Sequence, residues 1–136
     1  MTYNPQIAII ITTINRDNLL MECINSILEN IDLSWCKLII VDQNSLIYDS
    51  EEKKIFYSTA CASAHTRDNR NIEVIRQDYC SGTSQARHLG IAYAKALNIP
   101  HIIIGSDSNI FSKSFKQLLK LILLLKINQI ILQEAE

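Results

Sequence analysis

The chain has 136 residues, of which 48% are hydrophobic, and its formal net charge at pH 7 is -1. This length and apolar content predict one globular domain, residues 1–136, around a single core. No block of lysine and arginine stands out, which argues against a protein that binds nucleic acid through its phosphates. The four cysteines form no Cys-x-x-Cys pair. This spacing argues against a zinc site and favours reduced thiols in a cytoplasmic protein.

Four apolar runs rich in β-branched residues read as strands, and a polar cluster follows each of them. The runs are Ile7–Ile11, Leu38–Val41, Ile72–Ile75 and His101–Ile104. Because hydrophobic residues dominate the runs instead of alternating with polar ones, they predict parallel strands buried on both faces. Ligands of parallel sheets bind beyond the carboxyl ends of the strands. The polar clusters are therefore a candidate binding site.

Segments with helical character separate these strands. Asp17–Glu29 has an apolar stripe at helical spacing, and the side chain of Asn15 or Asp17 can cap its start. The further elements expected are helices over Ser50–Ala64, Thr83–Leu97 and Ser112–Lys126 and a short strand over Gln129–Gln133. This alternation predicts the α/β class, with a mostly parallel sheet flanked by helices.

The segment 115–131 is more apolar than one core-facing stripe requires. Leucine and isoleucine cover most of the circumference of the predicted helix. The apolar stretch is nevertheless too short, and too interrupted by lysines, to span a bilayer. We expect this surface to mediate self-association, and contact with a membrane surface is the alternative.

The first two polar clusters have the chemistry of a nucleotide pocket. Thr12, Thr13 and Asn15 offer small hydroxyl and amide groups at a strand end, which suit the edge of a base or ribose. Asp42 ends the second strand, where its carboxylate can accept hydrogen bonds from a base or ribose. The structural alternatives are a turn that caps the following helix for the first cluster and an Asx-turn for Asp42.

These clusters resemble, in order and spacing, the nucleotide-binding half of family 2 glycosyltransferases. The similarity is carried by Ile7–Arg16, Leu38–Ser45, Gly82–Gly90 and Ile102–Phe111. The third segment matches the family pattern Gly-x-Ser-x-Ala-Arg-Asn-x-Gly except at His88. The resemblance implies a GT-A fold, a Rossmann-like nucleotide-diphospho-sugar transferase fold, of which this chain holds only the amino-terminal half. It further implies a nucleotide-sugar donor and transfer of the sugar to an acceptor hydroxyl, in the synthesis of cell-surface polysaccharides or glycans.

The resemblance also assigns residues to the donor. It adds Ser84, Arg87 and Asp107 to the nucleotide-binding set that contains Thr12, Thr13, Asn15 and Asp42. The helix that begins after Gly82 can attract phosphate through its free N–H groups. The alternative for Arg87 is a structural salt bridge with Asp42 or Asp107. Gly90, on the same helix, is expected to allow close packing on the sheet.

The fourth cluster departs from the family pattern. The family places an Asp-x-Asp motif here, whose carboxylates hold a divalent cation at the diphosphate. This chain has Ser106, Asp107, Ser108 and Asn109 instead. Asp107 and Asn109 are the residues expected to hold Mg²⁺ or Mn²⁺, and neutral oxygens reduce the affinity for either ion.

Three functions are compatible with these features. The first is a truncated or degenerate glycosyltransferase, in which no residue of this chain is assigned as the general base. The second is a non-catalytic nucleotide-binding or interaction module. The third is an unrelated receiver-like or Rossmann-like domain. The Rossmann-like domain is disfavoured because no Gly-x-Gly-x-x-Gly turn follows the first strand. The receiver is disfavoured because Thr12 and Thr13 stand where paired acidic residues would be expected.

Overall fold

A computed structural model gives the architecture. It describes residues 5–14, 16–31, 33–43, 55, 71–77, 80, 82–112, 114–115, 117–121 and 123–124. The elements in chain order are β1 (Ile7–Ile14), α1 (Asp17–Asn30), β2 (Cys36–Gln43), β3 (Ile72–Arg76), α3 (Thr83–Ala96) and β4 (His101–Ser106). The predicted order of strands and helices is confirmed for these six elements. The helix expected over 50–64, apart from Ile55, and the strand expected over 129–133 lie outside the described residues.

The four strands form one parallel sheet in the order β3-β2-β1-β4. β1 and β2 are central and buried over almost their whole length, as expected for a continuous apolar run. The strands extend further than predicted, so Thr12, Thr13 and Asp42 lie within β1 and β2 and not in the turns after them. In the register, Thr13 is opposite Asp42 and Thr12 is opposite Ser106.

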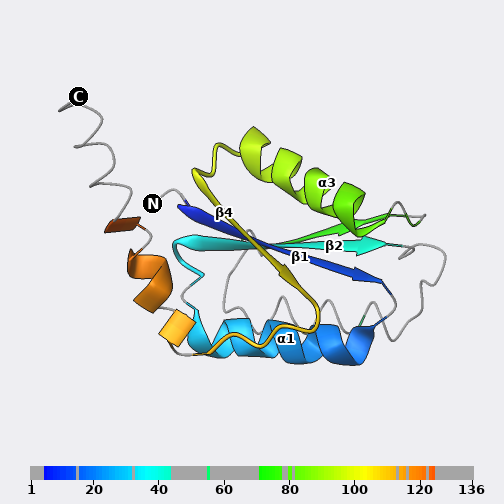
Figure 1. Cartoon of the computed structure of the whole chain (residues 1–136), viewed down its shortest axis with the longest axis horizontal. Coiled ribbons are helices and arrows are strands. Elements are labelled where there is room, and N and C mark those ends of the chain that lie inside the picture. Colours follow the sequence, from blue (N-terminus) through cyan, green and yellow to red (C-terminus); the bar gives the residue numbers. More distant parts are fainter. Residues whose placement is uncertain are drawn as a thin grey trace.

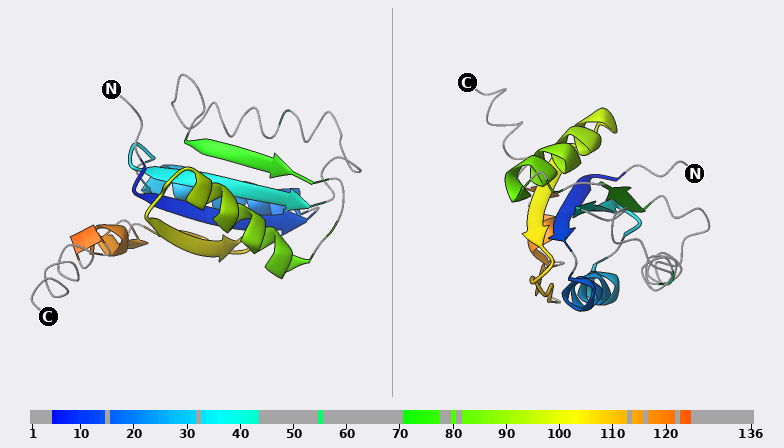
Figure 2. Two further views of the ribbon diagram at one scale, coloured as in Figure 1. Left: turned by 90° about the horizontal axis from the view of Figure 1, so that it is seen from above. Right: turned by 90° about the vertical axis from the view of Figure 1, so that its right-hand side faces the viewer.

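α1 and α3 cover opposite faces of the sheet (Figures 1 and 2). Alternate residues of a strand point to opposite faces. One set of strand side chains, including Ile9 and Ile40, therefore packs in a cluster with α1. The other set, including Ile10 and Ile39, packs in a smaller cluster with α3. By this alternation Thr13 and Asp42 belong to the α1 side, and Thr12 belongs to the α3 side.

α1 presents its apolar stripe to the sheet. Its buried residues are Leu20, Cys23, Ile24, Ser26 and Ile27. The residue that caps the helix is Arg16, which makes no side-chain capping hydrogen bond. The expectation that Asp17 caps α1 is therefore wrong: Asp17 is the first residue inside the helix, where its charge complements the helix dipole. Asn15, the other expected cap, lies outside the described residues.

α3 lies unusually close to the sheet because of one glycine. A Cβ atom at Gly90 would come within 2.6 Å of Cγ2 of Ile10 and 3.4 Å of Cγ2 of Val41. The packing role expected for Gly90 is confirmed. At the start of the helix, Gly82 has a positive φ of 90°, which side chains rarely tolerate and which makes glycine suited to this turn.

The described residues between 114 and 124 are helical and follow β4 at the edge of the sheet (Figure 1). Leu119 is fully buried and Phe115 and Leu123 pack against the same core, so one face of this segment belongs to the domain. Leu118, Leu121 and Leu124 are each about half exposed. In the described part of the chain, no helix combines the length and the apolar content needed to cross a bilayer.

Candidate functional site

The carboxyl ends of β1, β2 and β4 bring the predicted polar residues to one edge of the sheet. Parallel strands all end at the same edge, and the register places Thr13 beside Asp42 on one side and Thr12 beside Ser106 on the other. Thr12, Thr13 and Asp42 are buried, as is Asp107, which directly follows β4. Thr12, Thr13, Asp42 and Asp107 thus lie at the carboxyl edge of the sheet, with Thr12 on the face opposite to Thr13 and Asp42.

The centre of this group is the Asp107 carboxylate. Thr13 Oγ1 donates a hydrogen bond of 2.9 Å to Asp107 Oδ2. The same oxygen lies 3.6 Å from Nε of Arg16, which forms an ion pair with it. The side chain of Asp107 is 3% exposed and that of Arg16 is 55% exposed. A buried carboxylate thus has both a hydroxyl donor and a cation, which is what an ionised group needs when it leaves water.

The turn after β4 satisfies its own polar groups. Asn109 Oδ1 accepts a 2.7 Å hydrogen bond from the backbone N–H of Ser106, whose carbonyl accepts from the Asn109 N–H at 3.0 Å. The hydroxyls of Ser106 and Ser108 share a hydrogen bond of 2.8 Å. Gly105 allows this turn to fold back, because a Cβ atom there would lie 2.9 Å from Ile11 Cδ1 and 3.2 Å from Asn109 Oδ1.

Two polar residues of α1 fasten the segment that follows this turn. Ser26 Oγ accepts a 2.9 Å hydrogen bond from the Phe111 N–H and donates one of 2.7 Å to the carbonyl of Cys23. Asn30 Nδ2 donates to the Phe111 carbonyl at 3.0 Å. Because both backbone groups of Phe111 are held by one helix, α1 fixes where the chain leaves the strand-end cluster.

Cys23 lies beneath the same turn. Its thiol is fully buried and contacts the carbonyl of Ser106 at 3.7 Å. Burial, and secondarily the negative charge of Asp107, raise the pKa of the Cys23 thiol to about 12. The thiol therefore stays protonated at neutral pH and serves as a small, weakly polar core side chain, not as a nucleophile or metal ligand.

The remaining predicted site residues lie apart from this centre. Ser84 and Arg87 are exposed in the first turns of α3, which covers the other face of the sheet. The alternative in which Arg87 pairs with Asp107 is not what the structure shows, because the cation paired with that carboxylate is Arg16. Asn109 is exposed. Asn15 lies outside the described residues.

Sequence reasoning missed two residues at this edge. Arg16 received no site role from the sequence, although it ends the segment that resembles the family. Gln77 follows β3, donates its backbone N–H to the Asp42 carbonyl at 2.9 Å, and is 7% exposed. Its Oε1 atom is buried without a hydrogen-bond partner. The available signal was its position directly after an apolar run. The sequence reasoning took the site residues of this region from the later segment Gly82–Gly90 instead.

The residues present do not fit a dedicated site for a divalent cation. Mg²⁺ requires about six oxygen ligands in octahedral geometry, with carboxylates preferred. The turn provides one carboxylate, on Asp107, which already contacts Arg16 and Thr13. Asn109 Oδ1 is occupied by the Ser106 N–H. Among the described residues, no three histidines, cysteines, aspartates or glutamates are grouped in a way that could hold a metal ion.

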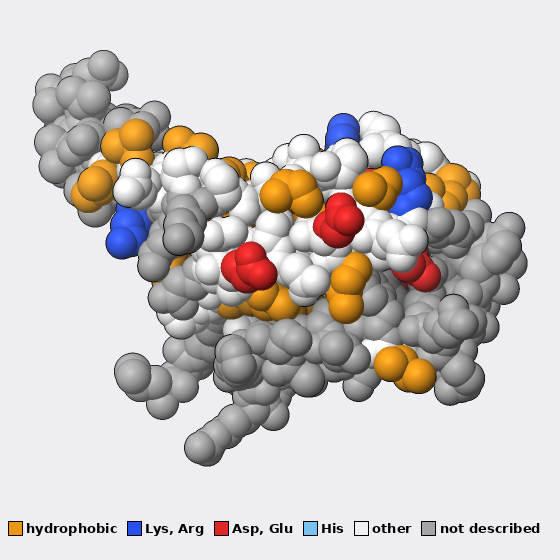
Figure 3. Space-filling view, turned by 90° about the horizontal axis from the view of Figure 1, so that it is seen from below, with side chains coloured by type: hydrophobic (Ala, Val, Ile, Leu, Met, Phe, Trp, Pro, Cys, Tyr) orange, Lys and Arg blue, Asp and Glu red, His pale blue; other side chains and the backbone are white. Residues whose placement is uncertain are grey.

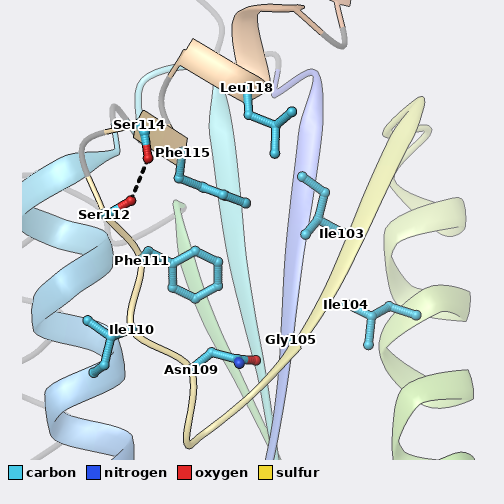
Figure 4. A pocket seen from close by; sticks show the side chains of 10 residues that line it. All are labelled: Ile103, Ile104, Gly105, Asn109, Ile110, Phe111, Ser112, Ser114, Phe115 and Leu118. Atoms are coloured by element: carbon cyan, nitrogen blue, oxygen red, sulfur yellow. Dashed lines mark hydrogen bonds between the residues drawn. The ribbon is translucent and has the colours of Figure 1, made fainter.

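A pocket of about 490 Å³ lies beside this cluster, along β4 and the segment after it (Figure 4). Its lining combines the apolar side chains of β4 and the following segment with Asn109, Ser112 and Ser114. Phe111 and Phe115 make an edge-to-face contact at 4.7 Å between ring centroids. Asn109 is the one predicted site residue that lines it. The pocket therefore lies along β4 and the segment after it, and neither Thr13 nor Asp107 lines it.

Comparison with known proteins identifies relatives of this fold. The sequence profile described as Glycosyl transferase family 2 matches residues 8–123. Among solved structures, TarS 1–349 of S. aureus superposes with a TM-score of 0.60 at 14% identity over 82% of this chain and 30% of TarS. Its complex with UDP-GlcNAc gives a TM-score of 0.61 at 15% identity, over 82% of this chain and 29% of that one.

A second solved relative is the mannosyltransferase PcManGT from Pyrobaculum calidifontis in complex with GDP-Man and Mn²⁺. It has a TM-score of 0.55 at 16% identity and covers 79% of this chain and 28% of its own. The chain thus spans less than a third of the length of these solved structures. No curated protein matches the sequence. The expected GT-A fold is confirmed by these superpositions.

Proposed function

Because this chain belongs to glycosyl transferase family 2, we propose that its strand-end cluster binds the nucleotide of a sugar-nucleotide donor. The observation that carries this proposal is the contact between Thr13 and Asp107, which joins two predicted site residues at the carboxyl edge of a parallel sheet. Ligands of such sheets bind at this edge. The proposed nucleotide-binding residues are Thr12, Thr13, Asn15, Asp42, Ser84, Arg87 and Asp107.

The chemistry of the residues suggests how they divide the nucleotide. Asp42 and the threonines supply buried acceptors and small hydroxyls, which suit the base and ribose. The first turn of α3 supplies free backbone N–H groups, and Arg87 supplies a guanidinium, which suit phosphate oxygens.

For the whole protein we propose transfer of the sugar to an acceptor hydroxyl. In this reaction the hydroxyl oxygen bonds to the anomeric carbon while the bond to the diphosphate breaks and the nucleotide diphosphate leaves. The hydroxyl proton passes to a general base, to which no residue of this chain is assigned. The domain 1–136 is proposed as the donor half, acting in cell-surface polysaccharide or glycan synthesis. The cytoplasmic location expected from the sequence stays a prediction.

Binding is tested by isothermal titration with UDP, GDP, UDP-GlcNAc and GDP-Man. Asp42→Asn should weaken the preferred ligand by about tenfold or more, because it loses a charge-assisted hydrogen bond. Asp17→Asn is the matched control, since it removes the same charge from an exposed position on α1. If none of the four ligands binds the wild-type chain, the proposed function is wrong.

A non-catalytic nucleotide-binding module is the second candidate, and the single carboxylate of the 106–109 turn favours it. The two candidates differ in turnover. Incubation with radiolabelled UDP-GlcNAc or GDP-Man, followed by separation of free and transferred sugar, distinguishes them. Nucleotide binding without release or transfer of sugar supports the module, whereas either product supports the enzyme.

We also propose self-association through the apolar 115–131 segment. Leu118, Leu121 and Leu124 remain about half exposed although Leu119 is buried. Figure 3 shows that several hydrophobic side chains reach the surface of the described part of the chain. Leu121→Glu should shift the chain toward a monomer in sedimentation velocity, whereas Leu89→Glu on α3 should not. A wild-type monomer at all concentrations contradicts this proposal. Sedimentation with anionic vesicles tests the alternative of membrane-surface contact.

A further inference from the structure

We propose that Arg16 joins Arg87 at a bound diphosphate, where the Arg16 guanidinium takes the place of a divalent metal ion. The inference rests on the proposed function, since it concerns how that same site would hold the donor. It starts from the Asp107 side chain, which is 3% exposed and already in contact with Arg16.

The first step concerns the carboxylate. A divalent cation would have to bind the carboxylate that now contacts the Thr13 hydroxyl at 2.9 Å and Arg16 Nε at 3.6 Å. A metal on this buried carboxylate would bring a second positive charge beside the guanidinium, and the two like charges would repel each other. The ion pair therefore opposes metal binding at Asp107.

The second step concerns the neutral oxygens of the turn. A metal that took Asn109 Oδ1 would break its 2.7 Å hydrogen bond with the Ser106 N–H. It would also compete with the 2.8 Å hydrogen bond between the hydroxyls of Ser106 and Ser108. Each loss removes a bond that now holds the turn in shape. The turn is thus built around its own hydrogen bonds and not around an ion.

The third step concerns the position of Arg16. Its backbone caps α1, where its carbonyl accepts a hydrogen bond from the Leu20 N–H at 2.9 Å. The helix therefore fixes the position of the Arg16 backbone. More than half of its side chain is exposed beside the strand ends. A guanidinium carries five N–H donors, and one contact to Asp107 leaves it able to bind phosphate oxygens as well. The amino terminus of α1 adds a positive dipole at the same place.

Arg16 also shields the site from Asp107. Without the guanidinium, the buried carboxylate would face a diphosphate as a like charge. Loss of Arg16 should therefore weaken nucleotide diphosphates strongly and nucleosides little. A residue that only supports the fold would instead affect the affinities for diphosphates and nucleosides equally.

The test compares UDP with uridine, and GDP with guanosine, by isothermal titration in EDTA and in MnCl₂. For the wild-type chain we expect the diphosphate affinity to change by less than about threefold between the two buffers. Arg16→Gln should weaken the diphosphate by about tenfold or more while the nucleoside changes by less than about threefold. Lys95→Gln, which removes the same charge from the last turn of α3, is the control.

Thermal melting of each variant verifies that it folds. The comparison of EDTA with MnCl₂ uses the wild-type chain and therefore does not depend on the folding of a variant. A diphosphate affinity that falls about tenfold or more in EDTA overturns the inference while the proposed function stands. Equal loss of nucleoside and diphosphate in Arg16→Gln also overturns it. If neither nucleotide binds the wild-type chain in either buffer, the proposed function and the inference fail together.

Discussion

The Thr13 hydroxyl donates a 2.9 Å hydrogen bond to the Asp107 carboxylate across 94 positions of sequence. Both side chains are buried, and the bond ties the end of β1 to the turn after β4. Hydrogen bonds to charged groups stabilise proteins more than neutral ones do, because a buried ion without them loses its solvation.

Thr13→Val should therefore destabilise the fold. The substitution keeps the side-chain shape, removes the donor, and should lower the free energy of unfolding by about 1.5–3 kcal/mol. Urea denaturation followed by circular dichroism measures the change. Thr12→Val makes the same chemical change on the other face of β1, and an equal loss in that variant would contradict the role assigned to the Asp107 contact.

Gly90→Ala should also destabilise the fold, although alanine normally stabilises a helix interior by about 1 kcal/mol relative to glycine. The added Cβ atom would lie 2.6 Å from Ile10 Cγ2, so the Ile10 side chain, α3 or β1 must shift. Overpacking of this kind costs about 1–3 kcal/mol before the gain in helix propensity is subtracted. A rise in melting temperature would show that α3 does not pack as closely as described.

Ser26→Ala should loosen the chain after β4. It removes the acceptor of the Phe111 N–H, which would be left buried without its bond, at a cost of about 1–3 kcal/mol. Hydrogen exchange of the Phe111 backbone amide should therefore be faster in Ser26→Ala than in the wild-type chain. Asn25→Ala, at an exposed position of the same helix, serves as the control and should leave both measurements unchanged. Unaltered exchange at Phe111 in Ser26→Ala would count against the hydrogen bond.

The Cys23 thiol should make stability depend on alkaline pH. Its pKa is raised from 9.0 to about 12 in the folded chain, so between these values the unfolded thiol ionises while the folded one does not. Stability is thus fully present below pH 9 and falls as the pH rises, by at most about 1.4 kcal/mol per pH unit. In Cys23→Ala, the free energy of unfolding measured by urea titration should fall less steeply across this pH range than in the wild-type chain. An equally steep fall in both chains would disprove the role of the Cys23 thiol.

The same burial predicts thiol reactivity. At mildly alkaline pH, iodoacetamide should label the exposed Cys80 in the folded chain and spare Cys23 and Cys36, which are buried. Peptide mass spectrometry before and after unfolding in urea locates the label. Rapid labelling of Cys23 under native conditions would mean that its side of α1 opens readily.

Periodicity was sufficient to predict the parts of the fold that depend on local pattern. The apolar runs of β1 and β2 are fully buried, and the stripe from Leu20 to Ile27 faces the sheet. The strand ends were placed too early, because Thr12, Thr13 and Asp42 are polar yet remain hydrogen-bonded within the sheet. Polarity alone does not mark the end of a buried strand whose last residues line a site.

The candidate site was predictable only in part, since its contacts join distant segments. Asp107 and Thr13 could each be singled out at a strand end, but their hydrogen bond depends on β4 lying beside β1. Arg16 received no site role from the sequence for the same reason: nothing within its own segment reveals that it contacts the Asp107 carboxylate. The burial of Gln77 likewise follows from packing and not from its neighbours in sequence.

The pairing of β4 with β1 also sets the order in which the site can assemble. A parallel pair needs a long connection, and closing it costs entropy before any contact is gained. A growing chain that has emerged only as far as β3 already contains Thr13, Arg16 and Asp42, but Asp107 has yet to be made. Thr13 and Arg16 can contact Asp107 only after β4 has docked against β1. Until then the guanidinium lacks the Asp107 carboxylate that it contacts in the folded domain, so the proposed donor site cannot form before β4 docks.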